Sequence, residues 1–549
     1  MCGIAGIWGH DEEDVVRTMM ARMVHRGPDA GGTFVAPGSR GVLGHRRLAI
    51  IDPAGGTQPI LGDSDASALV ANGEIYNYRT LNRQLAAGRT FRTRSDSETI
   101  LKLFHEVQDS AASKLDGMFA FVIADGDHVF AARDPIGIKP LYMGKRKGQW
   151  CFASEQKALV GIAEHVTEFP PGTSFHSAGG YRRFYQVPDP DPEPRLVDPH
   201  EAVWELREAL EAAVGKRLMS DVPLGAFLSG GLDSSIICAI ARRHMDQLHT
   251  FSVGFEGSRD LAAARQVARH LNTTHHEYVL TEEEVIRSLP KIIYHLESYD
   301  QDLVRSAIPT YFTARLAADY VKVILTGEGA DELFAGYRYH REIGESADLQ
   351  RELRRSIGAL HNINLQRVDR LTMAHSIEAR VPFLDVAMIA LAQQIPAEWK
   401  LRRMSDDRLV EKWILRKACE DLLPPDIVWR NKEQFDEGSG TAGMIGRRGL
   451  EDWLAVRESD HYARQHSEAA LRSPEECAYH KVLSEAYPEA EFVFQNVARW
   501  SSGRLGTGLG QDDVQRDQLV SGKQPMAHEL AEKPMQPLPG NQSSEKHVA

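Results

Sequence analysis

The chain has little of what marks several large classes of protein. Its five cysteines among 549 residues are too few and too widely spaced for a disulfide framework or a cysteine metal site. No stretch approaches the run of about 18 consecutive apolar residues that a membrane-spanning helix requires. Basic residues are not in excess either, since 64 lysines and arginines face 77 aspartates and glutamates, for a net charge of -13. These absences argue against a secreted disulfide-rich protein, a membrane protein and a general nucleic-acid binder, and they predict a soluble cytoplasmic enzyme.

The length of 549 residues predicts two or three domains, because single hydrophobic cores stop growing at about 250–300 residues. Residues 1–186 contain short alternating apolar runs, such as 41–45, 68–72 and 119–124, separated by Gly, Asp and Pro. This pattern predicts stacked antiparallel sheets with a few helices. Five prolines in the segment 187–199 interrupt the periodicity, so this segment is expected to be a linker.

Residues 200–504 alternate helical patterns with short apolar runs, which is typical of an open parallel α/β sheet. From Val386 onward the pattern is mainly helical, which predicts a helical C-terminal part. Residues 505–549 contain no Phe, Tyr or Trp and are expected to form a disordered tail. In the sheet region we expect helices over 200–218, 261–271 and 309–319 and strands over 224–228, 250–254 and 322–325.

Cys2 becomes the first residue once Met1 is removed, which places a thiol and a free α-amino group on one residue. An α-amino group titrates near about pH 8 and a thiol near about pH 8.5, so the amine can accept the thiol proton near neutral pH. Cys2 is therefore predicted to be a nucleophile that carries its own base. The other cysteines are predicted to be packing residues: Cys151, Cys238, Cys419 and Cys477.

A second reactive sequence lies between the apolar run that ends at Leu228 and a helix-like run from 236 to 240. Its glycines permit close approach of the backbone to an anion, its serines add donors, and the helix N-terminus contributes a positive field. It lacks the Gly-Lys-Ser/Thr of a Walker A loop, so transfer of a terminal phosphoryl group is not indicated. The prediction is a phosphate cradle, and the alternative is a glycine turn with a helix cap. The residues are Ser229, Gly230, Gly231, Leu232, Asp233, Ser234 and Ser235.

Acidic residues follow the next predicted strand, 323–325, at what should be another carboxyl edge of the sheet. Ligands of open parallel sheets gather at such edges. Asp331 is expected to complete a Mg²⁺ site with Asp233, because a bare carboxylate would otherwise repel a nucleotide. Glu328 is then available for substrate contact or proton transfer. The alternative is a solvated turn of helix-capping acids.

These motifs, in this order, resemble those of the glutamine-hydrolysing asparagine synthetases over about residues 2–500. That family joins an N-terminal-nucleophile glutaminase to a synthetase with an ATP-pyrophosphatase loop. The resemblance implies a ligase that converts aspartate to asparagine through β-aspartyl-AMP, using ammonia from glutamine and releasing glutamate, AMP and pyrophosphate. The matching segments are 2–4, 25–29, 45–52, 72–77 and 95–98 in the first half, and 229–235, 326–337, 376–385 and 429–435 in the second.

The resemblance also implies roles for single residues of the glutaminase half. Cys2 would form a γ-glutamyl thioester, and Asn72 with the Gly73 amide would form the oxyanion hole. Arg47 and Asp96 would bind the α-carboxylate and α-amino group of glutamine. Taken alone, Arg47 and Asp96 would be surface ion-pair residues, and Asn72-Gly73 would be a hairpin turn. The remaining implied glutamine contacts are Leu48, Ala49, Ile50, Ile51 and Glu74.

In the synthetase half, the resemblance implies that Lys432 stabilises the departing pyrophosphate and that Glu328 is catalytic. ATP is implied as a substrate and Mg²⁺ as a cofactor. The expected partners are the small molecules glutamine and aspartate or a related carboxylate, together with a second copy of the chain, and neither nucleic acid nor membrane. The implied ATP contacts are Leu228, Ser229, Gly230, Gly231, Asp233, Ser234, Ser235, Val253, Thr326, Gly327 and Lys432.

Two departures from the family pattern concern the acceptor. Residues 302–307 read Asp-Leu-Val-Arg-Ser-Ala where the family usually has Thr-Thr-x-Arg-Ala-Ser, and Arg370 replaces a family lysine. Two alternatives therefore stay open: an amidotransferase for another carboxylate, and a noncatalytic sensor that binds glutamine and ATP. Ammonia must also travel between the halves. The run 118–121 is a candidate lining for such a passage, or a plain core strand.

Overall fold

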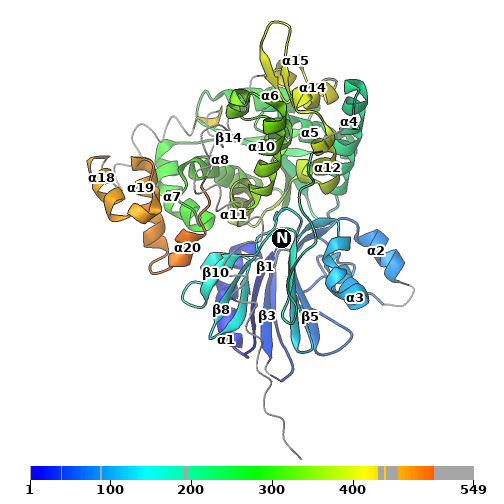
Figure 1. Ribbon diagram of the computed structural model, residues 1–549, viewed down its shortest axis with the longest axis vertical. Helices are drawn as coiled ribbons and strands as arrows, with labels where there is room; N and C mark the ends of the chain where they lie inside the picture. Colours follow the sequence, from blue (N-terminus) through cyan, green and yellow to red (C-terminus); the bar gives the residue numbers. More distant parts are fainter. Residues whose placement is uncertain are drawn as a thin grey trace, which may run out of the picture. The chain divides into compact units, whose positions relative to one another are not determined.

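The N-terminal part of the computed structural model consists of two antiparallel six-stranded sheets with short helices (Figure 1). The structure describes residues 2–38, 40–86, 90–190, 195–430, 438–440 and 456–499. The first sheet, in the order β10-β8-β9-β1-β3-β2, contains β1 (Cys2–Trp8), β2 (Ala30–Val35), β3 (Gly41–Arg47), β8 (Tyr142–Arg146), β9 (Gln149–Ala153) and β10 (Glu164–Glu168). The second, in the order β12-β11-β7-β6-β5-β4, contains β4 (Ile60–Leu61), β5 (Ser67–Ile75), β6 (Gly117–Asp125), β7 (His128–Arg133), β11 (Thr173–His176) and β12 (Gly180–Arg183).

The two sheets share an apolar layer to which β1, β3, β5, β6 and β9 contribute. Ile4, Leu43, Val70, Val122 and Phe152 are all buried in one cluster. The outer faces are covered by helices, so these strands are buried on both sides and are nearly continuously apolar. This arrangement confirms the predicted antiparallel sandwich. The helices of this part are α1 (Glu13–Ala21), α2 (Tyr78–Leu85), α3 (Ser97–Val107), η1 (Val24–Arg26), η2 (Gln108–Ser110), η3 (Ala112–Lys114) and η4 (Gln156–Ala158).

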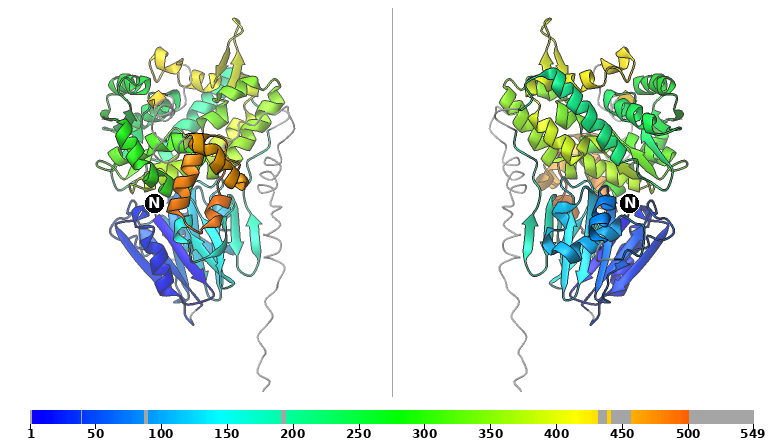
Figure 2. Two further views of the ribbon diagram at one scale, coloured as in Figure 1. Left: turned by 90° about the vertical axis from the view of Figure 1, so that its left-hand side faces the viewer. Right: turned by 90° about the vertical axis from the view of Figure 1, so that its right-hand side faces the viewer.

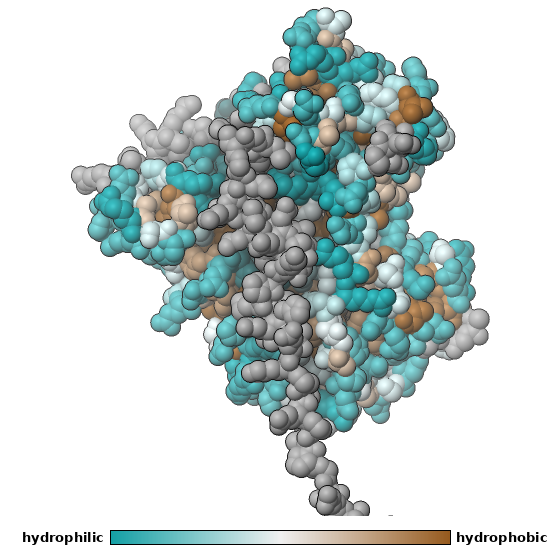
Figure 3. Space-filling view, in the orientation of Figure 1, coloured by the Kyte–Doolittle hydropathy of each residue, from teal (hydrophilic) through white to brown (hydrophobic). Residues whose placement is uncertain are grey.

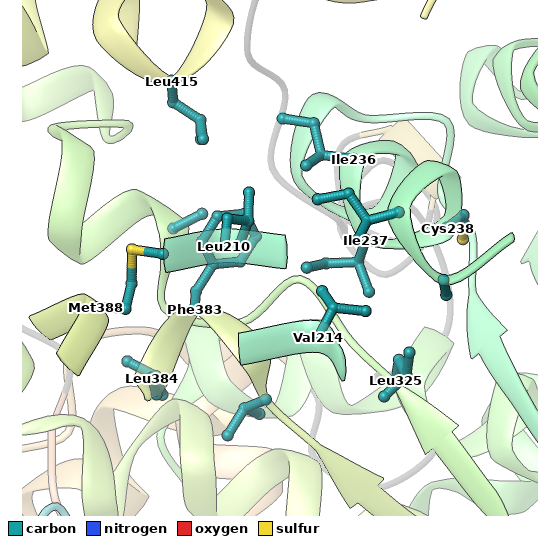
Figure 4. Packing of buried hydrophobic residues seen from close by; sticks show 14 of the residues in the cluster. Leu210, Val214, Ile236, Ile237, Cys238, Leu325, Phe383, Leu384, Met388 and Leu415 are labelled. Atoms are coloured by element: carbon teal, nitrogen blue, oxygen red, sulfur yellow. The ribbon is translucent and has the colours of Figure 1, made fainter. Parts of the chain in front are cut away.

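The synthetase part is built on a five-stranded sheet whose strands pair in parallel, as predicted. Its order is β15-β14-β13-β16-β17. Helices α4 and α5 bury one apolar stripe each against it, and Leu210, Val214, Ile236, Ile237 and Leu325 meet there (Figure 4). The strands are β13 (Leu224–Phe227), β14 (His249–Gly254), β15 (Thr274–Val279), β16 (Val323–Leu325) and β17 (Glu378–Arg380).

The helices around this sheet extend to the end of the described chain, and α19 packs against α7 and α8 (orange and green in Figure 2). They are α4 (Pro199–Lys216), α5 (Leu232–His244), α6 (Arg259–Leu271), α7 (Glu282–Leu296), α8 (Gln301–Ala317), α9 (Ala330–Phe334), α10 (Ser346–Gly358), α11 (Asn364–Met373), α12 (Val386–Gln394), α13 (Ala397–Lys400), α14 (Trp413–Ala418), α15 (Pro425–Val428), α18 (Val456–Gln465), α19 (Pro474–Ala486) and α20 (Glu491–Gln495). Short 3₁₀ helices are η5 (Arg338–Glu342), η6 (Leu360–Asn362), η7 (Pro382–Leu384) and η8 (Ser467–Ala469), and β18 (Leu401–Arg403) with β19 (Leu409–Glu411) forms a hairpin.

The predicted helices and strands of this part are confirmed with one clear error. Helix α8 begins at Gln301 rather than at Pro309, and Pro309 lies inside it. The Asp300 side chain caps the helix by accepting a hydrogen bond from the Leu303 amide at 2.9 Å. Burial of the first two turns compensates for the amide that proline lacks. No helix among the described residues is long and apolar enough to cross a membrane. The predicted tail, 505–549, and the linker residues 191–194 lie outside the described residues.

One apolar core joins the two halves. Leu48, Ile50 and Met118 of the glutaminase half belong to the same buried cluster as Val381 and Leu384 of the synthetase half. The predicted passage lining at 118–121 therefore divides. Met118 lies in this shared core, whereas the three residues after it pack inside the glutaminase half. The outer surface in view is mostly hydrophilic, with separate small hydrophobic patches (Figure 3).

Candidate active site

Cys2 is the first residue of the buried strand β1, and its neighbours hold its backbone from two sides. Its N–H donates to Asn72 Oδ1 at 2.8 Å, and its carbonyl accepts from Arg26 Nε at 3.0 Å. Burial raises the pKa of the Cys2 thiol, against the opposing effect of a hydrogen bond from the Leu48 backbone. The thiol is therefore protonated at neutral pH until a base takes its proton.

Asn72 is fully buried in the middle of β5, directly beside Cys2. Its Oδ1 is bonded to the Cys2 amide, while its Nδ2 has no hydrogen-bond partner among the residues that the structure describes. Buried donors are nearly always paired, so a donor left open beside a nucleophile is suited to a ligand oxygen. Gly73 has φ 145°, and a Cβ there would lie 1.9 Å from the Met118 carbonyl oxygen. The alternative of a hairpin turn at 72–73 is wrong, because both residues pair with β6 inside a sheet.

Replacing Asn72 by alanine removes the open Nδ2 donor. We expect kcat for glutamine hydrolysis to fall by about 10²–10³-fold, as when a donor to a developing oxyanion is lost. Ammonia-dependent synthesis should stay within about twofold of the parent. Asn77→Ala is the matched control, because the Asn77 amide bonds Lys114 and Asp116 instead of Cys2. Equal hydrolysis by Asn72→Ala and the parent would contradict the role given to the Nδ2 donor.

Arg47 is buried, and it shapes the loop that the resemblance assigns to glutamine binding. Its Nη1 donates to the Pro53 carbonyl at 3.0 Å and its Nη2 to the Asp52 carbonyl at 2.7 Å. The Ala49 amide of the same loop donates to Asp29 Oδ2 at 2.8 Å. The alternative of a surface ion pair does not apply, since Arg47 is 6% exposed and its described partners are carbonyls. Leu48, Ala49 and Ile50 are buried, and Ile51 is half-buried.

Asp96 and Glu74 are two buried carboxyls close to the same strand. Asp96 Oδ2 accepts from the Ile75 amide at 2.6 Å, and Glu74 Oε1 lies 3.4 Å from Nη2 of Arg380, a residue of β17. Burial raises the pKa of Asp96 to about 6 and that of Glu74 well above its ordinary value, and Glu378 adds to both shifts. Glu74, which the resemblance assigns to glutamine, thus also contacts the synthetase sheet.

The raised pKa of Asp96 predicts a pH dependence of glutamine use. A carboxylate binds the glutamine ammonium and a neutral carboxyl does not, so KM for glutamine should fall as the pH rises through about 6 and level off near 7. The fold holds this proton more tightly than the unfolded chain, whose carboxyl has a pKa near about 3.9. Asp96 therefore lowers the free energy of unfolding as the pH rises from about 4 to about 6. KM measured between pH 5 and 8 tests this, with Asp96→Asn as the control expected to show a high KM and no such step.

The predicted phosphate loop has the expected strand-loop-helix context, between β13 and α5. The Ser229 amide donates to Ser234 Oγ at 3.2 Å, and the two serine hydroxyls lie 3.0 Å apart. A Cβ on Gly230 would lie 2.4 Å from the Ala264 nitrogen, and one on Gly327 would lie 2.8 Å from the Ser234 nitrogen. The loops after β13 and β16 therefore adjoin, which brings Thr326 and Gly327 to the phosphate loop. Leu228 and Val253 are buried, but in different apolar clusters.

Asp233 and Asp331, the predicted metal ligands, converge on one lysine that the sequence did not indicate. Lys412 Nζ lies 2.6 Å from Asp233 Oδ2 and 2.6 Å from Asp331 Oδ1. Lys412 lies in the turn before α14, where its backbone has a positive φ of 55°. The residue is buried, with 1% of its surface exposed. A single lysine ahead of an ordinary helix carries no sequence signal. Two carboxylates around one cation are also a geometry that suits a divalent metal with phosphate oxygens.

Glu328, a predicted catalytic residue, forms a salt bridge with Arg367 of α11. Glu328 lies in the loop after β16, and its side chain is 23% exposed, so it is accessible to a ligand. The alternative of solvated capping acids does not describe this stretch, because Glu332 is buried and accepts from Tyr337 and Asn364. Lys432, the predicted pyrophosphate contact, lies outside the described residues.

The two departures from the family pattern have identifiable partners. Asp302 lies 3.9 Å from Arg305 and 3.9 Å from Arg472, and it is 40% exposed. Arg305 makes its shorter contacts to Glu475 of α19, including one of 2.9 Å from Nε. Arg370 is buried between the halves, where its Nη1 donates to the Ser154 carbonyl at 3.2 Å. The charge added by Asp302 is thus partly balanced by two arginines.

A cysteine at the start of a buried strand with an open amide donor beside it is the arrangement expected of a glutamine amidotransferase of the N-terminal-nucleophile class. Residues 1–172 match the glutamine amidotransferase domain family, and residues 205–346 and 341–501 match the asparagine synthase family. The chain belongs to the asparagine synthetase family. Named glutamine-hydrolysing asparagine synthetases similar to it come from Zea mays (39% identical over 88% of this chain and 86% of the relative), Arabidopsis thaliana (42%, 81% and 80%) and Sandersonia aurantiaca (40%, 81% and 88%).

Proposed function

We propose that the chain makes asparagine from aspartate, ATP and glutamine, with hydrolysis of glutamine at Cys2 and adenylation of aspartate at the parallel sheet. The observation that carries the proposal is the open Asn72 Nδ2 donor beside Cys2, whose own nitrogen is fixed 2.8 Å from Oδ1 of the same asparagine. Family membership supports the choice of aspartate as acceptor and ATP as the activating substrate.

In the glutaminase half, removal of Met1 converts the Cys2 nitrogen into an amine held by Asn72 Oδ1. The amine takes the thiol proton, and Sγ attacks the side-chain amide carbon of glutamine. Asn72 Nδ2 and the Gly73 N–H stabilise the oxyanion, and ammonia leaves with the proton. Water then hydrolyses the thioester and releases glutamate. Arg47 and Asp96 orient the substrate through its carboxylate and ammonium groups.

In the synthetase half, the loop 229–235 with Thr326 and Gly327 binds ATP, and Lys432 stabilises the departing pyrophosphate. The β-carboxylate of aspartate attacks the α-phosphorus, which forms β-aspartyl-AMP as pyrophosphate leaves. Ammonia attacks the acyl carbon next, and AMP leaves. In this proposal Glu328 accepts the proton that the attacking ammonia loses.

Asp233 and Asp331 suit a Mg²⁺ ion, because their carboxylates already surround one positive charge. Hard oxygen ligands of this kind, completed by phosphate oxygens, are what Mg²⁺ prefers. The bound ion would neutralise phosphate charge.

Ammonia must reach the second site unprotonated, and an apolar surrounding favours its neutral form. Leu48, Ile50 and Met118 lie near the glutaminase site, and Val381 and Leu384 continue the same cluster toward the synthetase sheet. We propose that ammonia crosses here. A cytoplasmic location and a homodimer complete the proposal as expectations of the family.

Incubation with ATP, Mg²⁺, aspartate and glutamine labelled with ¹⁵N at the side-chain amide tests the function. Labelled asparagine should appear in a one-to-one ratio with AMP. If AMP formed only with a different acid, the chain would be an amidotransferase for another carboxylate acceptor. The departure from the family pattern around Asp302 is what keeps this alternative open. Binding of glutamine and ATP without turnover would make the chain a sensor.

A further inference from the structure

Arg26 connects the carbonyl of the predicted nucleophile to the synthetase half. The residue ends η1 and is fully buried. Its Nε donates to the Cys2 carbonyl at 3.0 Å, while its other two nitrogens form a bidentate pair with Asp369 at 2.7 and 3.2 Å. Its Nη1 also donates to Glu155 Oε1 at 2.7 Å. One guanidinium thus holds Cys2 on one edge and a residue more than 340 positions away on the other.

Asp369 lies on α11, a helix that also contacts the acidic loop of the synthetase. Arg367 of this helix pairs with Glu328, and Asn364 Nδ2 donates to Glu332 Oε1 at 3.0 Å. Asp369 is 3% exposed, and both of its carboxylate oxygens face Arg26. A bidentate pair of this kind fixes the plane of the guanidinium as well as its position. The direction of the Arg26 Nε–H bond to Cys2 is therefore set by α11.

We propose that Asp369, a residue of the synthetase half, is a positioning residue for the glutaminase nucleophile. The glutaminase site is incomplete without α11, because Arg26 needs the Asp369 carboxylate to direct its Nε–H at the Cys2 carbonyl. Glu155 balances the charge of Arg26 but meets only its Nη1, so it does not fix the plane. This inference rests on the proposed hydrolysis of glutamine at Cys2.

The test is Asp369→Asn in the full chain. An amide cannot accept both guanidinium hydrogen bonds, so Arg26 should turn and Cys2 should lose its alignment. A displacement of about 1 Å at a reacting atom costs up to about 10²-fold in rate. We expect kcat for glutamate release to fall about 10–100-fold, with KM for glutamine within about threefold, because Arg47 and Asp96 are untouched. Ammonia-dependent asparagine synthesis should stay within about twofold of the parent.

Asp369→Glu and Arg26→Lys give the proposal two further readouts. The Asp369→Glu variant keeps a carboxylate and should recover most of the lost kcat. The Arg26→Lys variant cannot form the bidentate pair, so its kcat should be as low as that of Asp369→Asn. Asp116→Asn is the control, since Asp116 also pairs across the halves, at 2.9 Å to Lys216, without touching Arg26. It should retain parent kcat. An unchanged kcat in Asp369→Asn, or an equal loss of glutamine-dependent and ammonia-dependent activity in both Asp369→Asn and Arg26→Lys, would overturn the proposal. A parent that releases no glutamate would instead overturn the proposed function.

Discussion

Cys2→Ala is expected to lose glutamine-dependent asparagine synthesis by at least about 10³-fold and to keep ammonia-dependent synthesis within about twofold. The sulfur atom is the only nucleophile of the proposed thioester step, and a methyl group cannot replace it. Its removal leaves β1 intact, because the Cys2 backbone keeps its bonds to Asn72 and Arg26. Asparagine and glutamate measured with glutamine and with ammonium salt give the comparison.

Cys477→Ala is the control for this variant. Cys477 is also buried, but it packs with Ala478 in a small cluster of the C-terminal helices. Both activities should stay near the parent values, at a modest cost in stability. If glutamine-dependent synthesis survived in Cys2→Ala, a group other than the Cys2 thiol would attack the side-chain amide of glutamine. Loss of both activities in that variant would instead contradict the division of the chemistry between the halves.

Lys412→Met is expected to lower both glutamine-dependent and ammonia-dependent synthesis by about 10²–10³-fold, while glutamate release stays within about threefold. Lys412 is the cation between Asp233 and Asp331, so its removal takes one positive charge out of the proposed phosphate site. The free energy of unfolding should fall by about 2 kcal/mol without metal, because two half-buried carboxylates lose the cation that they share. Added Mg²⁺ should raise the unfolding temperature of the variant more than that of the parent.

Lys417→Met is the matched control, since Lys417 lies on α14, the helix that follows Lys412, and pairs with Glu420 at the surface. Its synthesis rate should equal that of the parent. If Lys412→Met made asparagine at the parent rate, the lysine would have no part in nucleotide binding. If its stability showed no response to Mg²⁺, the two aspartates would not be a metal site.

Much of the fold was predictable because periodicity reports which faces are buried. Strands β13, β14 and β16 and the loop between β13 and α5 follow from local patterns, and the parallel sheet follows from their alternation with helices. The error at α8 arose because Pro309 fits the first turn of a helix, whereas burial and the Asp300 cap place the start eight residues earlier. Tertiary packing decided the boundary.

The site was predictable only where its residues form motifs. Cys2 and the order of motifs after it indicated the glutaminase, whereas the metal site predicted from the acidic residues after two strands stays a proposal. Lys412, Arg26 and Asp369 could not be assigned a role, because their chemistry depends on partners that are distant in the chain. A lysine between two aspartates and an arginine between a nucleophile and a helix are properties of the folded state alone.

The shared core has a consequence for protein engineering. Because Leu48, Ile50 and Met118 belong to the same buried cluster as Val381 and Leu384, the apolar core continues from one half into the other. A chimera that joins this glutaminase to a different synthetase would leave holes or clashes at the junction unless both sets of side chains were transplanted together. A substitution in the core of either half is thus constrained by the side chains of the other half, and the two halves are expected to evolve together.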